Sequence, residues 1–204
     1  MTNTTYKRGG KAEIKWTGGT QGRSVSVTVY HWFNAQHNNG IQKCLVQYSG
    51  TMSGNKGTIE GLVPGQRYWI VLTDSANSGN TAWVDFQAPK GARPNASFKL
   101  AAFNSNYNKN NDYVVLSPEF TISGLSGKKT FNYVFVLAMP NGDLLRTDDM
   151  KWELGNGYYY FGDDGFRFYW NDIVRTYGSI PSGSYMFQLI VDDYIVGSKT
   201  LSIR

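Results

Sequence analysis

Residues Gly61–Leu72 read GLVPGQRYWIVL, and this stretch decides the fold of the first half of the chain. The segment Val63–Gln66 predicts a tight turn, because proline presets one backbone dihedral and glycine accepts a positive φ. From Tyr68 onward the pattern alternates between two faces, which predicts a β-strand. One face carries Tyr68, Ile70 and Leu72, and the other carries Trp69 and Val71.

A leucine, a Pro-Gly turn and a tyrosine that enters a strand resemble the E–F corner of fibronectin type III domains, where the tyrosine hydroxyl bonds back to the backbone. This resemblance covers about residues 3–90. It implies a β-sandwich in which the strands that carry Tyr30, Trp69 and Trp83 are neighbours in one sheet. Because such sandwiches host many unrelated functions, the resemblance implies a fold and leaves the function open.

The whole composition predicts an all-β protein. The 204 residues include 23 glycines and 15% aromatic residues, without a long Ala/Leu/Glu/Lys stretch. Two prolines and a glycine in Ala88–Pro94 predict a linker. We therefore expect two tandem β-sandwich domains: a fibronectin type III-like domain at 1–88, a linker at 89–94, and an immunoglobulin-like domain at 95–204.

The second domain is assigned from 22 residues near its end and from its turns. SGSYMFQLIVDDYIVGSKTLSI at 182–203 loosely resembles the closing hairpin of immunoglobulin-like domains in bacterial surface and phage virion proteins. Asp192-Asp193 is the expected turn of that hairpin, and Asn141-Gly142 predicts another. We expect an Asn-rich loop at 104–112 and separate strands at 113–116 and 119–123.

Charge divides where the domains are expected to divide. Nine basic and four acidic residues precede residue 93, whereas the remaining eleven basic and eleven acidic residues cancel.

The lone Cys44 excludes an intramolecular disulfide and predicts a buried thiol. The N-terminus has no apolar segment of a secretory signal, so we expect either that the protein is made without one or that one was removed and a Met added. No apolar run is long enough for a membrane span.

The sequence favours a non-catalytic protein without a cofactor or a metal. The only histidines, His31 and His37, do not form a metal-binding spacing, and no nucleophile elbow or phosphate-binding glycine loop is present. Adjacent aspartates occur at 148–149, 163–164 and 192–193. Neighbouring aspartates in turns point in different directions, so they do not predict the paired carboxylates of a glycosidase. Asp163-Asp164 lacks the spaced ligand series of a calcium loop.

Aromatic residues give the strongest functional signal. Strand alternation points four aromatic side chains outward in the first domain: Tyr30, Trp32, Trp69 and Trp83. A hairpin centred near Ala76 or Asn77 would place Trp69 almost opposite Trp83. Such an apolar patch marks either a partner interface or a surface that the chain itself covers. The basic residues Lys7, Arg8, Lys11 and Lys15 are either a solvated face or a docking surface for an anionic protein.

In the second domain the aromatic residues are too many for one face. They form a core with an interface belt, or they include a carbohydrate-binding face. The candidates for stacking on sugar rings are Trp152, Tyr159, Tyr169 and Trp170. We expect an accessory decoration protein on a phage capsid or tail, with other virion proteins as partners, no nucleic acid and no membrane insertion. The alternative is a bacterial cell-surface or secreted carbohydrate-binding or adhesion module.

Overall fold

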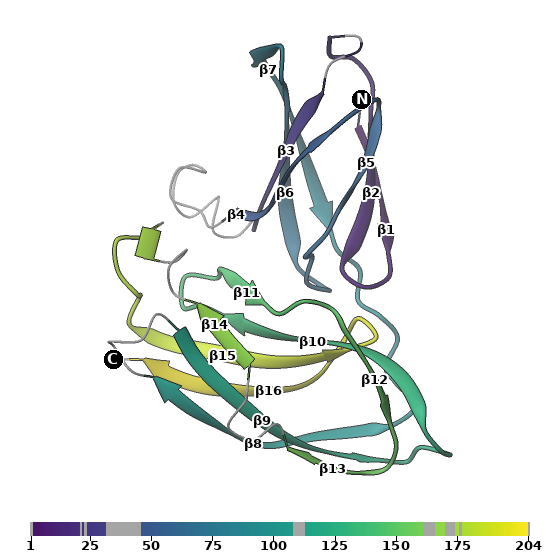
Figure 1. Ribbon diagram of the computed structural model, residues 1–204, viewed down its shortest axis with the longest axis vertical. Helices are drawn as coiled ribbons and strands as arrows, with labels where there is room; N and C mark the ends of the chain where they lie inside the picture. Colours follow the sequence, from purple (N-terminus) through teal and green to yellow (C-terminus); the bar gives the residue numbers. More distant parts are fainter. Residues whose placement is uncertain are drawn as a thin grey trace. The chain divides into compact units, whose positions relative to one another are not determined.

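The computed structural model describes residues 2–20, 22, 24–31, 46–107, 113–160, 166–169, 174–175 and 177–203. The chain divides into two compact units, Met1–Lys90 and Gly91–Arg204, at a point inside the predicted linker. Both units are built from antiparallel β-sheets, which confirms the predicted all-β class of tandem sandwiches (Figure 1). No helix in the described residues is long and apolar enough to cross a membrane.

The first unit packs two sheets face to face. Its described strands are β1 (Thr2–Lys7), β2 (Lys11–Trp16), β3 (Val25–His31), β4 (Val46–Met52), β5 (Lys56–Ile59), β6 (Arg67–Asp74) and β7 (Asn77–Gln87). One sheet has the order β1–β2–β5 and the other the order β4–β3–β6–β7 (Figure 1). The strands that carry Tyr30, Trp69 and Trp83 are therefore neighbours in one sheet, as the fibronectin type III resemblance implies.

The core of this unit follows from the alternation in its strands. Inward residues of β2, β3 and β6 are buried, and the residues between them point away from the core. These inward side chains are Ala12, Ile14 and Trp16, then Val25, Val27 and Val29, then Tyr68, Ile70 and Leu72. Burial of apolar surface on this scale is the main stabilising term of a sandwich.

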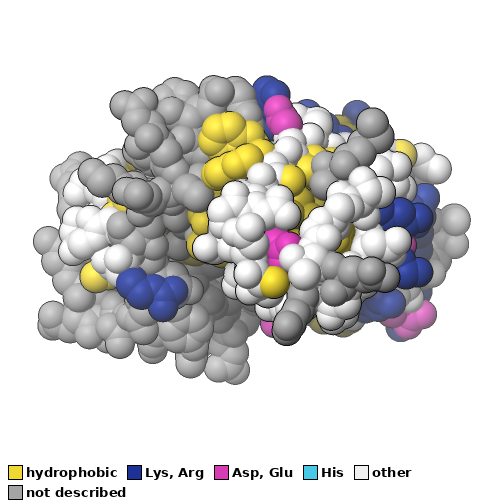
Figure 2. Space-filling model, turned by 90° about the horizontal axis from the view of Figure 1, so that it is seen from above, with side chains coloured by type: hydrophobic (Ala, Val, Ile, Leu, Met, Phe, Trp, Pro, Cys, Tyr) yellow, Lys and Arg dark blue, Asp and Glu magenta, His cyan; other side chains and the backbone are white. Residues whose placement is uncertain are grey.

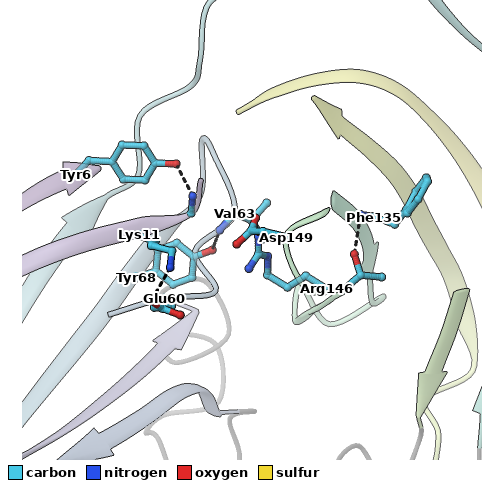
Figure 3. Close-up of polar contacts among 10 residues, drawn as sticks. Tyr6, Lys11, Glu60, Val63, Tyr68, Phe135, Arg146 and Asp149 are labelled. Carbon is cyan, nitrogen blue, oxygen red and sulfur yellow. Dashed lines mark hydrogen bonds and ion pairs between the residues drawn. The ribbon is translucent and has the colours of Figure 1, made fainter. Parts of the chain in front are cut away.

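The Tyr68 corner confirms the predicted turn. The N–H of Gln66 donates to the carbonyl oxygen of Val63 at 3.2 Å, and Gly65 has a φ of 77°. The Tyr68 ring is fully buried, and its hydroxyl accepts a hydrogen bond from the backbone N–H of Val63 at 2.6 Å (Figure 3). The hydroxyl therefore satisfies a buried backbone donor that the turn leaves without a strand partner.

The second unit is also a sandwich of two sheets. Its described strands are β8 (Ser97–Tyr107), β9 (Tyr113–Ser123), β10 (Lys129–Ala138), β11 (Leu144–Arg146), β12 (Met150–Leu154), β13 (Gly157–Tyr160), β14 (Phe166–Tyr169), β15 (Gly183–Val191) and β16 (Tyr194–Ile203). One sheet follows the order β11–β10–β15–β16, with β12 paired to β10. In the other sheet, β9 pairs with β8, β13 and β14.

A second tyrosine corner lies at the start of β15. The hydroxyl of the fully buried Tyr185 donates to the carbonyl oxygen of Pro181 at 2.7 Å. From Tyr185 every second side chain of β15 enters the core, as predicted. The predicted immunoglobulin-like character of this unit stays a prediction, and this corner is the observation that speaks for it.

Two predicted turns of the second unit form, one of them in a different way. Asp192 and Asp193 have φ values of 48° and 67° and join β15 to β16, as predicted. The other turn is centred on Pro140 and Asn141, because the N–H of Gly142 donates to the carbonyl oxygen of Met139 at 2.9 Å. Gly142, with a φ of 88°, therefore follows the turn and does not form its centre.

Two predicted boundaries are wrong. β8 continues through Asn104 to Tyr107, inside the predicted loop, because these residues pair with β9. β9 is one strand and not two. On the edge of β9 opposite to β8, β13 pairs with 119–122 and β14 pairs with 113–116. Pro118 therefore lies between these two ladders and interrupts neither. A proline at that gap removes no ladder hydrogen bond to either strand.

The two corners allow a paired test. Tyr68→Phe removes the acceptor of the buried Val63 N–H, so we expect the first unit to lose about 1–3 kcal/mol of unfolding free energy. Tyr185→Phe removes the donor to Pro181, and we expect a loss of about 1 kcal/mol in the second unit. Hydrogen exchange followed peptide by peptide measures each unit separately. Each variant is the control for the other, and equal destabilisation of both units by one variant would contradict the assignment.

Candidate functional site

The outward residues of the β4–β3–β6–β7 sheet form rows across neighbouring strands. In one row Val46 lies opposite Tyr30, which lies opposite Trp69. In the next row, Val71 lies opposite Trp83. We call these five residues the aromatic face. The row beyond Val71 contains only hydroxyl side chains, namely Thr51, Ser26, Thr73 and Thr81.

The two tryptophans are diagonal neighbours and not opposite each other. Trp69 is paired with Asp85, because the β6–β7 register shifts between Thr73 and Asp74 and leaves 78–80 as extra residues in the hairpin. The observed partner of Trp69, Asp85, is two residues from Trp83 along β7, so both rings stay on the same face. Their centroids lie 5.4 Å apart at an interplanar angle of 60°, an edge-to-face contact.

The aromatic face is accessible at its outer strands. Trp83 on β7 is 49% exposed and Val46 on β4 is 46% exposed. Val71 is buried although it points away from the core, which places it beneath its larger neighbours. In the view of Figure 2, hydrophobic side chains gather at the surface apart from the main group of Lys and Arg side chains. The guanidinium of Arg67 forms an ion pair with Asp85 at the border of the aromatic face.

The predicted basic candidates lie on the opposite side of the sandwich. Lys7, Lys11 and Lys15 point outward from the β1–β2–β5 sheet, whose inward residues pack in the core. Arg8 is exposed in the turn between β1 and β2. Lys56 joins this surface because it is paired with Lys15, which the sequence pattern alone did not indicate. The basic and aromatic residues therefore lie on different faces of the first unit and do not form one continuous surface.

In the second unit, the side chain of Tyr159 packs against the core. It points inward from β13, its ring stacks on Phe120 at 5.4 Å, and its hydroxyl exchanges hydrogen bonds with the backbone of Gly155. The ring of Tyr159 is therefore partly buried and takes part in packing. The exposed residues of this strand are Tyr158 and Tyr160, at 59% and 48%.

Of the other three glycan candidates, only the side chain of Trp152 is described. Trp152 is 39% exposed, and its ring contacts Tyr133 at 6.2 Å and Tyr159 at 5.6 Å. It is thus partly engaged in packing. Trp32 and Trp170 lie outside the described residues, as do Cys44, His37 and Asp163-Asp164, and the side chain of Tyr169 is not described.

Tyr158 sits in a polar setting. It is paired with Thr121 on β9, and Tyr160 is paired with Glu119. A hydrogen bond with the Glu119 carboxylate raises the pKa of Tyr158 above its ordinary value of 10.0. The two exposed rings and the carboxylate therefore form one outward array on the sheet that contains β9.

His31 takes a structural position. His31 is buried beside Tyr68, and its Nε2 lies 3.0 Å from Oε1 of Gln66, next to the corner. In the described part of the chain, no group of three or more His, Cys, Asp or Glu side chains is placed to hold a metal ion.

Asp74 organises a glycine-rich loop at one end of the first unit. Its carboxylate accepts hydrogen bonds from the N–H and the hydroxyl of Thr20, both at 2.8 Å, and from the N–H of Ala76 at 2.9 Å. These bonds, first that of Ala76, hold the pKa of Asp74 below its ordinary value of 3.8. A pocket of about 330 Å³ lies beside Asp74 and Trp16. The carboxylate is already occupied by loop donors, so its role is to shape the loop.

The lowered pKa of Asp74 predicts an acid-sensitive contribution to stability. The unfolded chain binds this proton more readily than the folded chain does. The contribution is therefore present above pH 3.8 and is lost as the pH falls through the lower folded value. We expect Asp74→Asn to be less stable than the wild type at pH 7, with a smaller gap at pH 2. Urea midpoints at both pH values measure this gap, and a gap that widens in acid would contradict the assignment.

Trp83 should matter little for folding. Because half of its side chain is already exposed, we expect Trp83→Ser to change the unfolding free energy of the first unit by less than about 1 kcal/mol. Ile70→Ala, at a fully buried site on the neighbouring strand, should cost about 2–5 kcal/mol. Hydrogen exchange of peptides from β3 and β6 provides the comparison. A loss for Trp83→Ser as large as that for Ile70→Ala would make Trp83 a core residue.

Comparison with known proteins finds similarity to solved structures at low sequence identity. No protein-family model matches it, and no curated protein matches it. It is similar to the FN1–FN3 domains of chicken CNTN1, at 12% identity and a TM-score of 0.33, over 98% of this chain and 63% of that one. It is also similar to a two-domain fibronectin type III segment of chicken tenascin, at 10% identity and a TM-score of 0.35, over 100% of this chain and 98% of that one. The fold assignment rests on strand order and on the Tyr68 corner.

Proposed function

We propose that this chain is a non-catalytic interaction protein that docks through the aromatic face of its first unit. We further propose that it works as an accessory decoration protein on the outside of a phage virion, on the capsid or the tail. The observation that carries the proposal is the half-exposed Trp83, whose ring meets Trp69 at 5.4 Å on an outward sheet face.

The composition of the aromatic face suits a protein partner. Tryptophan and tyrosine are enriched among the residues that dominate protein–protein binding energy, and each can bury about 150–250 Å². The surrounding side chains are polar: a row of hydroxyls on one side and the Arg67–Asp85 ion pair on the other. An apolar centre with a polar border is the usual anatomy of an interface.

The virion setting is supported by the cysteine content and by the two sandwich units. One cysteine in 204 residues leaves no intramolecular disulfide, which suits a protein assembled in a reducing cytoplasm. Stability must then come from the two packed cores, and both units have one.

The test is rebinding to particles. Antibodies against the purified chain should label purified virions from the source of the sequence, and the wild-type chain should rebind to particles that lack it. We expect Trp83→Ser to lose about tenfold or more in affinity, because one buried tryptophan contributes at least about 1.4 kcal/mol at an interface centre. Trp152→Ser, a comparably exposed tryptophan in the other unit, is the matched control. Absence of the chain from the particles, or equal binding of both variants, would refute the proposal.

One observation favours a second candidate, a carbohydrate-binding or adhesion module at a bacterial surface. Tyr158 and Tyr160 present two exposed rings on one strand beside Glu119. Two residues apart on a strand, they are about 7 Å apart, close enough to contact neighbouring sugar rings. Retention of the chain on insoluble bacterial polysaccharide, lost in the Tyr158→Ser/Tyr160→Ser variant and kept in Trp83→Ser, would favour this function over the first.

A further inference from the structure

The outward face of the β1–β2–β5 sheet carries two like-charged pairs. Lys7 on β1 lies opposite Lys11 on β2, and Lys15 on β2 lies opposite Lys56 on β5. We call these four residues the basic face. Like charges directly opposite each other on neighbouring strands destabilise a sheet. Two such pairs on one small sheet are therefore an arrangement that folding alone does not favour.

Two internal carboxylates relieve only part of this repulsion. Nζ of Lys11 lies 2.7 Å from Oε1 of Glu60, and Nζ of Lys15 lies 3.1 Å from Oε1 of Glu13. In the described part of the chain, Lys7 and Lys56 have no ion pair, and both are exposed. The face therefore keeps a net positive charge with two ammonium groups available to a partner.

The available ammonium groups stand at opposite corners of the basic face. Lys7 is on one edge strand and Lys56 is on the other, and they are four residues apart along β2 in register. With about 4.8 Å between strands and about 3.4 Å per residue, their backbone positions are roughly 17 Å apart. A partner that neutralises both must present carboxylates at separated points along an extended surface.

The basic face and the aromatic face are the two outer sides of the same sandwich. Ala12 and Ile14 of β2 point into the core from one sheet, and Ile70 of β6 points into it from the other. Outward residues of the two sheets therefore point in opposite directions. One flat partner surface cannot contact both faces.

We propose that the β1–β2–β5 face is a second docking surface, which binds an extended acidic segment of a partner protein across Lys7, Lys11, Lys15 and Lys56. The first unit then bridges two partners, one on each outer side. This inference rests on the proposed function as an interaction module and adds a second partner of defined chemistry.

The chemistry of the face favours a protein over nucleic acid. Glu13 and Glu60 lie inside the basic face and would repel a continuous row of phosphates. The residues between the two lysine rows are Thr5, Glu13 and Thr58, so this row offers no aromatic ring for stacking on bases. A protein segment can place carboxylates over the lysines and neutral side chains over Glu13.

The test uses a synthetic peptide in which Glu alternates with Thr, with a Gln-for-Glu peptide as the uncharged control. We expect fluorescence anisotropy to show binding of the Glu peptide that weakens about tenfold between about 0.025 M and about 0.15 M salt. Lys7→Gln/Lys56→Gln should bind about tenfold more weakly than the wild type. Lys128→Gln/Lys151→Gln removes the same charge from exposed positions of the second unit and should bind as the wild type does.

Three results would overturn the proposal: no binding of the Glu peptide, equal weakening by both lysine variants, or tighter binding of duplex DNA than of the Glu peptide at equal salt. Equal weakening would mean attraction to net charge alone, and tighter DNA binding would assign the face to nucleic acid. Trp83→Ser should bind the Glu peptide normally. If that variant loses particle binding and keeps normal peptide binding, the two faces act separately. Particle binding tests the aromatic face and peptide binding tests the basic face, so the failure of one proposal can be told apart from the failure of the other.

Discussion

The hydrogen bond between the Val63 N–H and the buried Tyr68 hydroxyl fixes where β6 begins and which way its side chains point. With Tyr68 inward, the two-residue period of a strand turns Trp69 outward. β6 is paired with β3 and with β7. Because residues opposite each other in a sheet point to the same face, the orientation of β6 also sets Tyr30 and Trp83 outward. A slip of one residue would put tryptophans into the core and Ile70 into water. The aromatic face thus depends on a contact on the inner side of the sheet.

The second unit obeys the same constraint through Tyr185. Its hydroxyl bonds back to Pro181, four residues earlier, and Pro64 likewise stands four residues before Tyr68. In both units the strand that follows is central, between β3 and β7 or between β10 and β16. This second corner lacks the Pro-Gly signature of the first, because the glycine stands directly after Pro64 but two residues after Pro181.

The sequence predicted which side chains of a strand face inward where apolar residues alternate with residues of a different kind. The alternation around Tyr68 predicted the outward tryptophans, and the resemblance to fibronectin type III domains carried by the same stretch implied the corner and the sheet neighbours. It failed where neighbours are alike. In Tyr158–Tyr160 any of three tyrosines could face inward, and only the pairing of Tyr159 with Phe120 decides the matter. The extra residues 78–80 and the pairing of Lys56 with Lys15 also depend on long-range register, which local patterns do not contain.

Hydrophobic packing accounts for the inner sides of the first unit's two sheets but not for what lies outside them. A solvated sheet would be most stable with mixed charges opposite each other and few large rings. Instead, one outer side keeps Trp83 half exposed beside Trp69, and the other pairs lysine with lysine twice. In our proposals these two departures serve partners of opposite chemistry, apolar on one side and acidic on the other. Because a sandwich is only about 10 Å thick between its sheets, such a unit is short enough to link two surfaces that touch it from either side.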